Sequence, residues 1–192
     1  MIMNIEIEKL FWDVDEVDLR RKILESGGKL IKQKTLYKRV VKSFGEVEGI
    51  YSWIRIRDEG DKVMMTLKKR KDDNSYSEEY EVEVSDFNAA KNIFENSPIG
   101  INSYQENYRE VYALNDCEIA IDIWPFLEPV CEIESESEEK VFETGKILDL
   151  DFEKSFNKNI TSVYKMKYGK FITDLTVDKQ KQFYFGAENP FD

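Results

Sequence analysis

The sequence predicts an α+β protein built around a large antiparallel sheet or barrel. Segments in which apolar and polar residues alternate recur along the chain, a few segments have helical spacing, and short turn sequences join neighbouring strands. Runs of hairpin-linked strands with a few helices are typical of α+β proteins. At 192 residues, the chain is long enough for one domain with its own core.

The N-terminal half of the chain is predicted to contain a strand, a helix and a series of hairpins. Residues 4–11 alternate as in a strand, and residues 13–28 have helical spacing with a stop at Gly27 and Gly28. Strands then alternate with turns: strands 30–43, 51–57, 62–70 and 78–84, and turns 45–49, 58–61 and 71–75.

The C-terminal half combines helices with three further strands. Ser85 or Asp86 can cap a short helix that ends before Pro98. Another helix starts at Ser135 or Ser137, and a last short helix is expected at 160–169. The strands are 108–114, 117–124 and 129–135. We expect one domain over residues 1–169 and a C-terminal tail over 170–192, for which packing on the domain is one option.

The composition limits the classes of function. The net charge of -11 argues against nucleic acid or an anionic membrane as a partner. The absence of histidine excludes histidine catalysis and argues against a conventional zinc site, so a metal would need the oxygen ligands that Mg²⁺ and Mn²⁺ accept. Cys117 and Cys131 are too few for a disulfide framework, and no apolar run could cross a membrane. We therefore expect a cytoplasmic protein, as a monomer or homodimer.

Charged side chains occupy every second position of most predicted strands. Glu6 and Glu8 share one face of the first strand, with Ile5 and Ile7 on the other face. Acids dominate the first strand, strand 78–84 and the last strand, whereas bases dominate the two hairpin strands between them. The alternating charged residues are Arg55, Arg57, Lys68, Arg70, Glu79, Glu81, Glu83, Asp122, Glu132 and Glu134.

Two interpretations of this alternation remain open on the residues alone. The first is an antiparallel sheet with one solvated face. The second is a barrel whose apolar outside is covered by helices and whose lumen holds carboxylates for a metal and bases for a polyanion. Glu6 and Glu8 would lie ~7 Å apart, where their repulsion is roughly 2 kcal/mol at an effective dielectric of about 20. A closed interior would need cations to offset this repulsion, and Arg39 and Arg70 are either lumen residues or residues of a solvated strand end.

Seven short motifs between residues 4 and 168 resemble one known family. They are EIEKL (6–10), RIR (55–57), TLK (66–68), EEYEVEV (78–84), Arg109 with Tyr112, Asp122, and EIE (132–134). In this order and spacing they resemble the CYTH superfamily, also called triphosphate tunnel metalloenzymes. The superfamily includes thiamine triphosphatases, inorganic triphosphatases and class IV adenylyl cyclases.

The resemblance implies an eight-stranded, closed antiparallel β-barrel, a tunnel with a charged lumen and helices packed outside. It also implies Mg²⁺ or Mn²⁺ as cofactor and a triphosphate-containing small molecule as ligand. Carried over by motif, the metal ligands would be Glu6, Glu8, Asp122, Glu132 and Glu134, with Glu81 for a second metal. The triphosphate-binding residues would be Arg55, Arg57, Lys68 and Arg109, and the catalytic residues Glu6, Glu8 and Glu132.

The first motif departs from the family pattern. The family motif is Glu-x-Glu-x-Lys, but position 10 is Leu10 and the lysine is Lys9. On an unbroken strand, Lys9 would point away from the face of Glu6 and Glu8, and only a bulge would bring it back. In the family, that lysine contacts the bound phosphates.

Four functions are compared. The favoured one is a divalent-metal-dependent triphosphatase acting on a nucleotide, thiamine triphosphate or tripolyphosphate. The alternatives are a class IV adenylyl cyclase that makes cyclic AMP from ATP, and a non-catalytic triphosphate- or polyphosphate-binding protein, which Leu10 favours. A carrier of an apolar ligand would need an apolar lumen, and the segregated charges contradict it.

Overall fold

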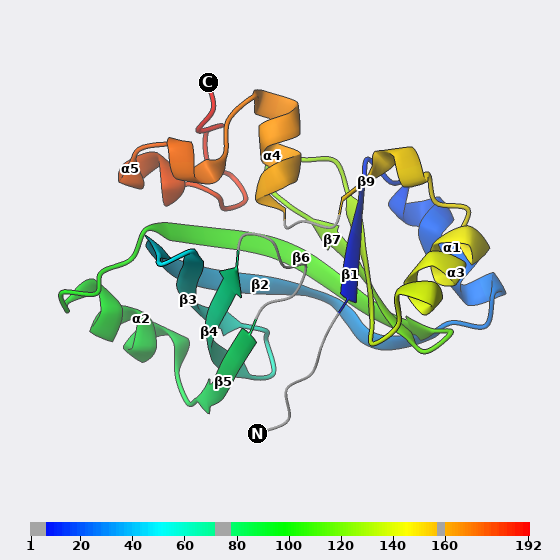
Figure 1. The fold of residues 1–192 in the computed structure, drawn as a ribbon, viewed down its shortest axis with the longest axis horizontal. Coiled ribbons are helices and arrows are strands. Elements are labelled where there is room, and N and C mark those ends of the chain that lie inside the picture. The colour runs from blue at the N-terminus through cyan, green and yellow to red at the C-terminus, as the bar shows by residue number, and fades with distance from the viewer. Residues whose placement is uncertain (1–6, 72–77, 157–159) are drawn as a thin grey trace. The chain divides into compact units, whose positions relative to one another are not determined.

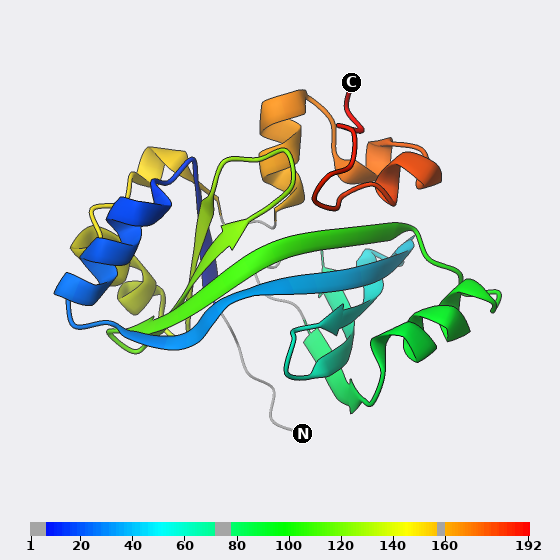
Figure 2. The same cartoon turned by 180° about the vertical axis from the view of Figure 1, so that it is seen from behind.

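A computed structural model describes residues 7–71, 78–156 and 160–192 (Figure 1). The chain divides into two compact units. The first unit comprises Leu36–Asn107 and Ile172–Asp192, and the second comprises Tyr108–Phe171 and the described residues up to Thr35. Figure 2 shows the same fold from behind.

The strands of the described residues form one sheet. They are β1 (Ile7–Trp12), β2 (Lys29–Val47), β3 (Ile50–Asp58), β4 (Val63–Lys71), β5 (Glu78–Val84), β6 (Ser103–Leu114), β7 (Cys117–Ile123), β8 (Val130–Ser135) and β9 (Ser155–Phe156). Their order in the sheet is β5-β4-β3-β2-β6-β7-β8-β1-β9. The α+β class is therefore confirmed.

The prediction of a closed, eight-stranded barrel is wrong for the part of the chain that the structure describes. That part forms nine strands, and its sheet ends at β5 and β9 instead of closing on itself. Closure would require the two end strands to pair. In the second unit, the short strand β9 takes the outer edge of β1, where Phe156 pairs with Leu10 and Ser155 with Phe11.

The first unit has one helix against the apolar face of its strands. Helix α2 (Phe87–Glu95) is capped by Asp86, one of the two predicted candidates, whose carboxylate accepts a hydrogen bond from the Ala89 N–H. Phe87 and Phe94 of α2 belong to a buried cluster with Val40 and Ile56 from β2 and β3. This packing places the alternate, charged residues of β2 and β3 on the other face.

Strand β2 is longer than predicted because a bulge and a tight turn replace the expected five-residue loop. The register with β3 shifts between Ser43 and Gly45, so the pairing continues to Val47. Glu48 and Gly49 both have positive φ, as the favoured two-residue hairpin turn requires.

The C-terminal segment belongs to the first unit. It contains two short helices, η2 (Ile172–Asp174) and α5 (Val177–Gln180). The fully buried Phe183 forms a parallel bridge with Gln105, and its carbonyl accepts a hydrogen bond from the Glu106 N–H at 2.7 Å. The sequence analysis had assigned no structure to this segment.

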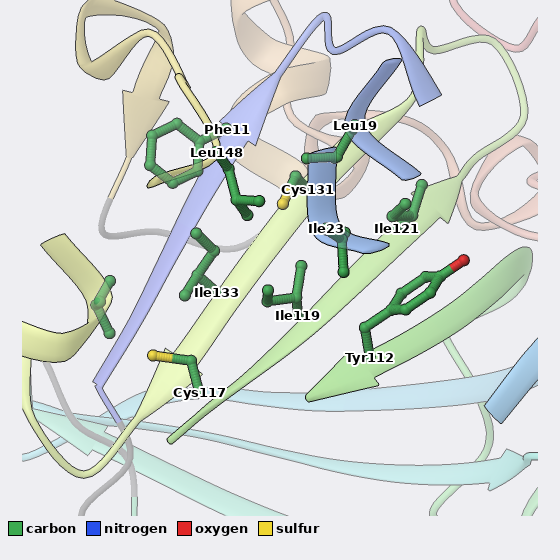
Figure 3. Packing of buried hydrophobic residues seen from close by; sticks show 11 residues of the cluster. Phe11, Leu19, Ile23, Tyr112, Cys117, Ile119, Ile121, Cys131, Ile133 and Leu148 are labelled. Carbon is green, nitrogen blue, oxygen red and sulfur yellow. The ribbon is translucent and has the colours of Figure 1, made fainter. Parts of the chain in front are cut away.

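The second unit packs α1 (Glu16–Glu25) and α3 (Glu138–Ile147) against one face of its strands (Figures 1 and 2). Figure 3 shows Leu19 and Ile23 of α1 above Ile119 and Ile133 of β7 and β8. The unit also contains the helical turn η1 (Phe152–Lys154) and helix α4 (Thr161–Tyr168). Among the described residues, no helix is sufficiently long and apolar to span a bilayer.

Candidate functional site

In the second unit, the predicted acidic residues lie on the sheet face that α1 and α3 do not cover. Cys131 and Ile133 belong to the buried apolar cluster, so the alternate residues Glu132 and Glu134 lie on the opposite face of β8. Glu8 of β1 pairs directly with Glu134, and so does Glu118 of β7. Three carboxylates thus form one cross-strand row, and the sequence analysis did not single out Glu118.

Arg109 joins two of the predicted metal ligands. Its Nε donates a hydrogen bond to Asp122 Oδ1 at 2.9 Å, and its Nη2 donates to Asp122 Oδ2 at 2.6 Å. Nη2 also donates to Glu132 Oε2. Asp122 is only 2% exposed, so these contacts supply the cation that a buried carboxylate needs.

The surroundings of Arg109 and Cys131 determine their protonation states. Burial alone would lower the pKa of Arg109, but the charges of Asp122 and Glu132 outweigh burial and raise this pKa well above its ordinary value. Burial raises the pKa of the Cys131 thiol, and Asp122 and Glu132 raise it further. Arg109 is therefore a permanent cation, and Cys131 stays a neutral thiol that is unsuited to nucleophilic catalysis.

The register of β1 confirms that Lys9 points away from Glu8. Strand β1 pairs with β8 without a register shift from Ile7 to Trp12. The Lys9 ammonium lies 5.8 Å from the centre of the Phe152 ring, which packs against the apolar cluster. Leu10, 4% exposed, pairs with Glu132 instead. An apolar side chain therefore takes the place of the family lysine.

In the first unit, the predicted triphosphate-binding residues share one face. Arg55 and Arg57 alternate with Ile54 and Ile56, which belong to or pack on the cluster beneath α2. Thr66, which pairs with Arg55, is fully buried. Lys68 lies on the same face of β4, two residues further along. The hypothesis of a freely solvated face does not account for the burial of Thr66.

Acidic side chains within the first unit hold several of these cations. Arg57 Nε donates to Glu59 Oε1 at 2.7 Å, and the ring of Tyr37 lies 5.5 Å from the Arg57 Cζ. Lys68 forms an ion pair with Glu79 of the end strand β5. Glu81, the candidate for a second metal, accepts a hydrogen bond from Thr66 Oγ1 at 2.7 Å.

Further residues of this face escaped the sequence analysis or were left open by it. Arg39 is 8% exposed and donates a hydrogen bond to Asn107, which is fully buried, so of the two options left open for Arg39 the solvated strand end is excluded. Ser103 and Gln105 precede Asn107 at every second position of β6 and are also buried. The alternation of residues 103, 105 and 107 could have predicted that the strand starts before residue 108. However, these uncharged polar residues are also typical of a loop.

The donor chemistry fits a divalent cation, although the described residues do not form a preformed cage. Glu8, Glu132 and Glu134 offer hard oxygen ligands on one sheet face. Within residues 7–71, 78–156 and 160–192, no group of three or more acidic or cysteine side chains is placed to hold a metal ion. Magnesium usually takes one or two carboxylates plus substrate phosphates, so a three-ligand cage is not required. The predicted ligand Glu6 lies outside the described residues.

The fold defines an α+β protein with an antiparallel sheet. In the first unit, guanidinium groups lie opposite the apolar cluster, and in the second unit carboxylates lie opposite its own apolar cluster. A sequence profile of the CYTH domain matches residues 46–162. The chain therefore belongs to the CYTH family, as its motifs predicted. Members of this family are triphosphatases or adenylyl cyclases, and their enzymes generally depend on a divalent metal. A search of the curated proteins gives no match.

Solved structures with this fold come from archaea, bacteria and a plant. A conserved protein from Pyrococcus furiosus is 21% identical over 81% of this chain and 97% of its own, with a TM-score of 0.68. A candidate adenylate cyclase from Vibrio parahaemolyticus is 8% identical over 85% and 99%, with a TM-score of 0.69. A candidate adenylyl cyclase from Hippeastrum, with a dominant triphosphatase activity, is 16% identical over 88% and 97%, with a TM-score of 0.50. At these identities, the similarity shows the fold.

Proposed function

We propose that this protein is a divalent-metal-dependent triphosphatase that binds an organic or inorganic triphosphate. The observation that carries the proposal is the grouping of Arg55, Arg57 and Lys68 on one face of β3 and β4, opposite the apolar cluster. Guanidinium forks and an ammonium at this spacing are the groups that bind the oxygens of a polyphosphate. Family membership supports the same assignment.

In this mechanism, the chain positions the phosphates and neutralises their charge. Arg55 and Arg57 would bind phosphate oxygens through paired N–H donors, and Lys68 would add a point charge. Arg109 is oriented by Asp122 and Glu132 and would contribute a further guanidinium. Hydrolysis breaks the bond between the terminal phosphorus and its bridging oxygen as a water oxygen attacks that phosphorus.

The carboxylates of the second unit have the donor chemistry for Mg²⁺ or Mn²⁺. Glu8, Glu132 and Glu134, with Glu6 and Asp122 from the same motifs, would hold the ion. When bound, such an ion supplies charge neutralisation at the phosphate oxygens and lowers the pKa of the attacking water. Glu6, Glu8 and Glu132, the catalytic residues that the motifs imply, would also orient this water against the terminal phosphorus.

A second function, triphosphate binding without turnover, is favoured by one observation. Leu10 is buried opposite Glu132, and Lys9 lies over Phe152 on the other face. The protein thus lacks a cation at the position where the family contacts phosphate. A third candidate, an adenylyl cyclase, would use the same face with the ribose 3'-hydroxyl as nucleophile and pyrophosphate as leaving group.

The experiment is a product assay with tripolyphosphate, ATP and thiamine triphosphate in Mg²⁺ or Mn²⁺. A triphosphatase releases orthophosphate, and Glu132→Gln should reduce this rate at least about 100-fold. Glu139→Gln, which removes an exposed carboxylate at the start of α3, is the matched control and should retain the rate. Pyrophosphate with cyclic AMP would assign a cyclase. Metal-dependent binding without any product would assign a binding protein, and neither binding nor product would refute the proposal.

A further inference from the structure

The first unit contains a pocket of about 390 Å³ on the side of its strands that α2 covers. Its walls come from β2, α2, the start of β6 and the segment that follows α5. Lys38 of β2 lines the pocket and shares a sheet face with Val40 of the apolar cluster, whereas Arg39 lies on the opposite face. The pocket is therefore separate from the face that carries Arg55 and Arg57.

Three lysines from separate segments line this pocket, which we call the lysine pocket. They are Lys38 of β2, Lys91 of α2 and Lys181, which follows α5. All three are half-buried. Within residues 7–71, 78–156 and 160–192, Lys38 and Lys181 form no ion pair, and the one ion pair of Lys91 is a long contact of 3.8 Å with Glu95. Two of the three cations thus have no described carboxylate within ion-pair distance.

The two carboxylates that line the lysine pocket have donors of their own. Asp58 is the cross-strand partner of Lys38, and its Oδ1 accepts a hydrogen bond from the Gly60 N–H at 2.9 Å. Glu95 makes the contact with Lys91. An anionic ligand would therefore find the ammonium groups of the other two lysines available as donors.

Apolar and aromatic side chains form another part of the wall. Phe87 and Ile101 belong to the apolar cluster beneath α2, and Tyr104 packs against it. The Tyr104 ring lies 5.7 Å from the Lys91 ammonium. The Tyr104 hydroxyl donates to Glu106 Oε1 at 2.6 Å, and burial, followed by this bond, raises the pKa of the phenol. Tyr104 therefore stays neutral and adds no negative charge to the pocket.

An apolar wall beside ammonium groups without ion pairs defines the chemistry of a ligand. Small-molecule sites have volumes of roughly 300–1,000 Å³ and combine apolar walls with a few polar groups that fix orientation. In the lysine pocket, an aromatic ring can cover the apolar wall while an anionic group accepts charged hydrogen bonds from the lysines. Lysine suits such a group because its ammonium is a point charge on a flexible stem.

We propose that the lysine pocket binds a small organic anion, an aromatic ring that carries a phosphate or carboxylate group. Lys38 and Lys181 bind the anionic oxygens, and the ring contacts Phe87, Ile101 and Tyr104. This site is independent of the proposed triphosphatase, because it lies on the other face of the strands and uses none of the residues assigned to triphosphate or metal.

The test is a fluorescence titration of the full chain with anilinonaphthalene sulfonate, an aromatic anion whose emission rises in apolar surroundings. Lys38→Gln and Lys181→Gln should each weaken its binding about 5- to 20-fold, because each removes a charged hydrogen bond from a partly exposed site. The matched control is Lys42→Gln on the same face of β2, where the lysine is also half-buried but does not line the pocket. It should change the affinity less than about twofold.

Competition with small molecules tests the chemical class of the ligand. Phenyl phosphate and benzoate should displace the probe at concentrations at least about tenfold lower than orthophosphate, which lacks the ring, or benzyl alcohol, which lacks the charge. The better competitor of the two aromatic anions identifies the anionic group. Displacement by benzylamine at equally low concentrations would mean that the carboxylates dominate the pocket, and it would overturn the proposal.

The variants also show whether the probe occupies this pocket. Loss of affinity in Lys38→Gln and Lys181→Gln, with unchanged melting temperatures and with wild-type affinity in Arg57→Gln, supports the proposal. An equal loss in Lys42→Gln or Arg57→Gln would place the probe elsewhere on the chain, and no binding to the folded wild type would also overturn the inference. Neither result bears on the triphosphatase, whose product assay does not depend on this pocket.

Discussion

A single side chain, Leu10, separates the hydrolytic and the non-catalytic hypotheses. It lies on the sheet face of Glu8, is buried and pairs with Glu132, whereas Lys9 stacks over Phe152 on the apolar side. Since β1 contains no bulge against β8, no local rearrangement brings the lysine back. Any loss of activity from the missing lysine should therefore be reversed only by a substitution at position 10.

Leu10→Lys should raise kcat/KM for tripolyphosphate about tenfold, because an ammonium on this face can donate to the phosphate oxygens. The variant should lose about 1–2 kcal/mol of stability, since apolar area is exposed or replaced by a polar head. Initial rates and urea unfolding measure the two effects. Leu10→Met, which keeps an apolar chain of similar length, is the control. Equal kcat/KM values for the two variants would contradict the prediction.

The sequence predicted the faces of individual residues better than it predicted their partners. Alternation placed Arg55, Arg57 and Glu132 on the charged face, because strand geometry fixes parity. It could not show that Arg109 joins Asp122 to Glu132, since such contacts depend on cross-strand register. Nor could it show that the buried Asn107 accepts a hydrogen bond from Arg39 of another strand.

At the scale of elements, charged residues of one strand form ion pairs with those of the neighbouring strand. Strand β5 is an end strand among the described residues, and its acids face the bases of β4, as Glu79 does for Lys68. Acids on a sheet edge also discourage pairing with other chains. If Lys68 binds triphosphate as proposed, Glu79 of β5 would compete with the phosphate ligand for the Lys68 ammonium group.

Glu79→Gln should lower the KM for tripolyphosphate roughly twofold to fivefold, as expected for the release of a partly exposed ion pair. The effect should shrink at high salt, where such pairs are screened. Glu78→Gln, one residue earlier and on the opposite face, is the control for net charge. If both variants change KM equally, a general charge effect explains the result and the specific competition is absent.

The end of α1 was predicted from Gly27 and Gly28. In the structure, each position favours glycine for a different physical reason. Gly27 has a φ of 86°, in the left-handed region. Gly28 donates a hydrogen bond to the Ile23 carbonyl at 2.8 Å, and a Cβ on Gly28 would lie 2.7 Å from that oxygen. The second glycine is needed for close approach to the helix.

Gly28→Ala should therefore destabilise the protein by about 1–3 kcal/mol through overpacking against the α1 backbone. Urea unfolding measures this loss, which should come with an unchanged slope of free energy against urea. Ser26→Ala, at the exposed end of the same helix, should stay within about 0.5 kcal/mol of the wild type. Matching unfolding midpoints for the two variants would rule out the close approach.

At the scale of the whole molecule, local patterns predicted the elements but not their assembly. Most strands and the caps at Asp86 and Ser137 were correct, because alternation and capping are local signals. The predicted closure was wrong for the described residues, and the ninth strand and the structure of the C-terminal segment were not predicted. Each depends on pairing between distant residues, as between Leu10 and Phe156 or Gln105 and Phe183.

Ligand-linked stability tests the assignment on the intact chain, whether or not turnover occurs. A ligand that binds only the folded state at about 100 times its Kd adds about 2.7 kcal/mol to the free energy of unfolding. For a chain of this size, that increase should raise Tm by roughly 5–11 °C. We expect tripolyphosphate to give such a shift in EDTA, and Arg57→Gln to reduce it strongly.

Orthophosphate at matched ionic strength controls for screening of the net charge of -11, which by itself stabilises an acidic protein. The Tm could rise equally with orthophosphate and tripolyphosphate, or equally in Arg57→Gln and in the wild type. Either result would mean that the cations of the first unit do not form a triphosphate site. A specific shift without product release would identify a binding protein, because the linkage depends on affinity alone. A specific shift together with orthophosphate release that Glu132→Gln abolishes would identify the triphosphatase.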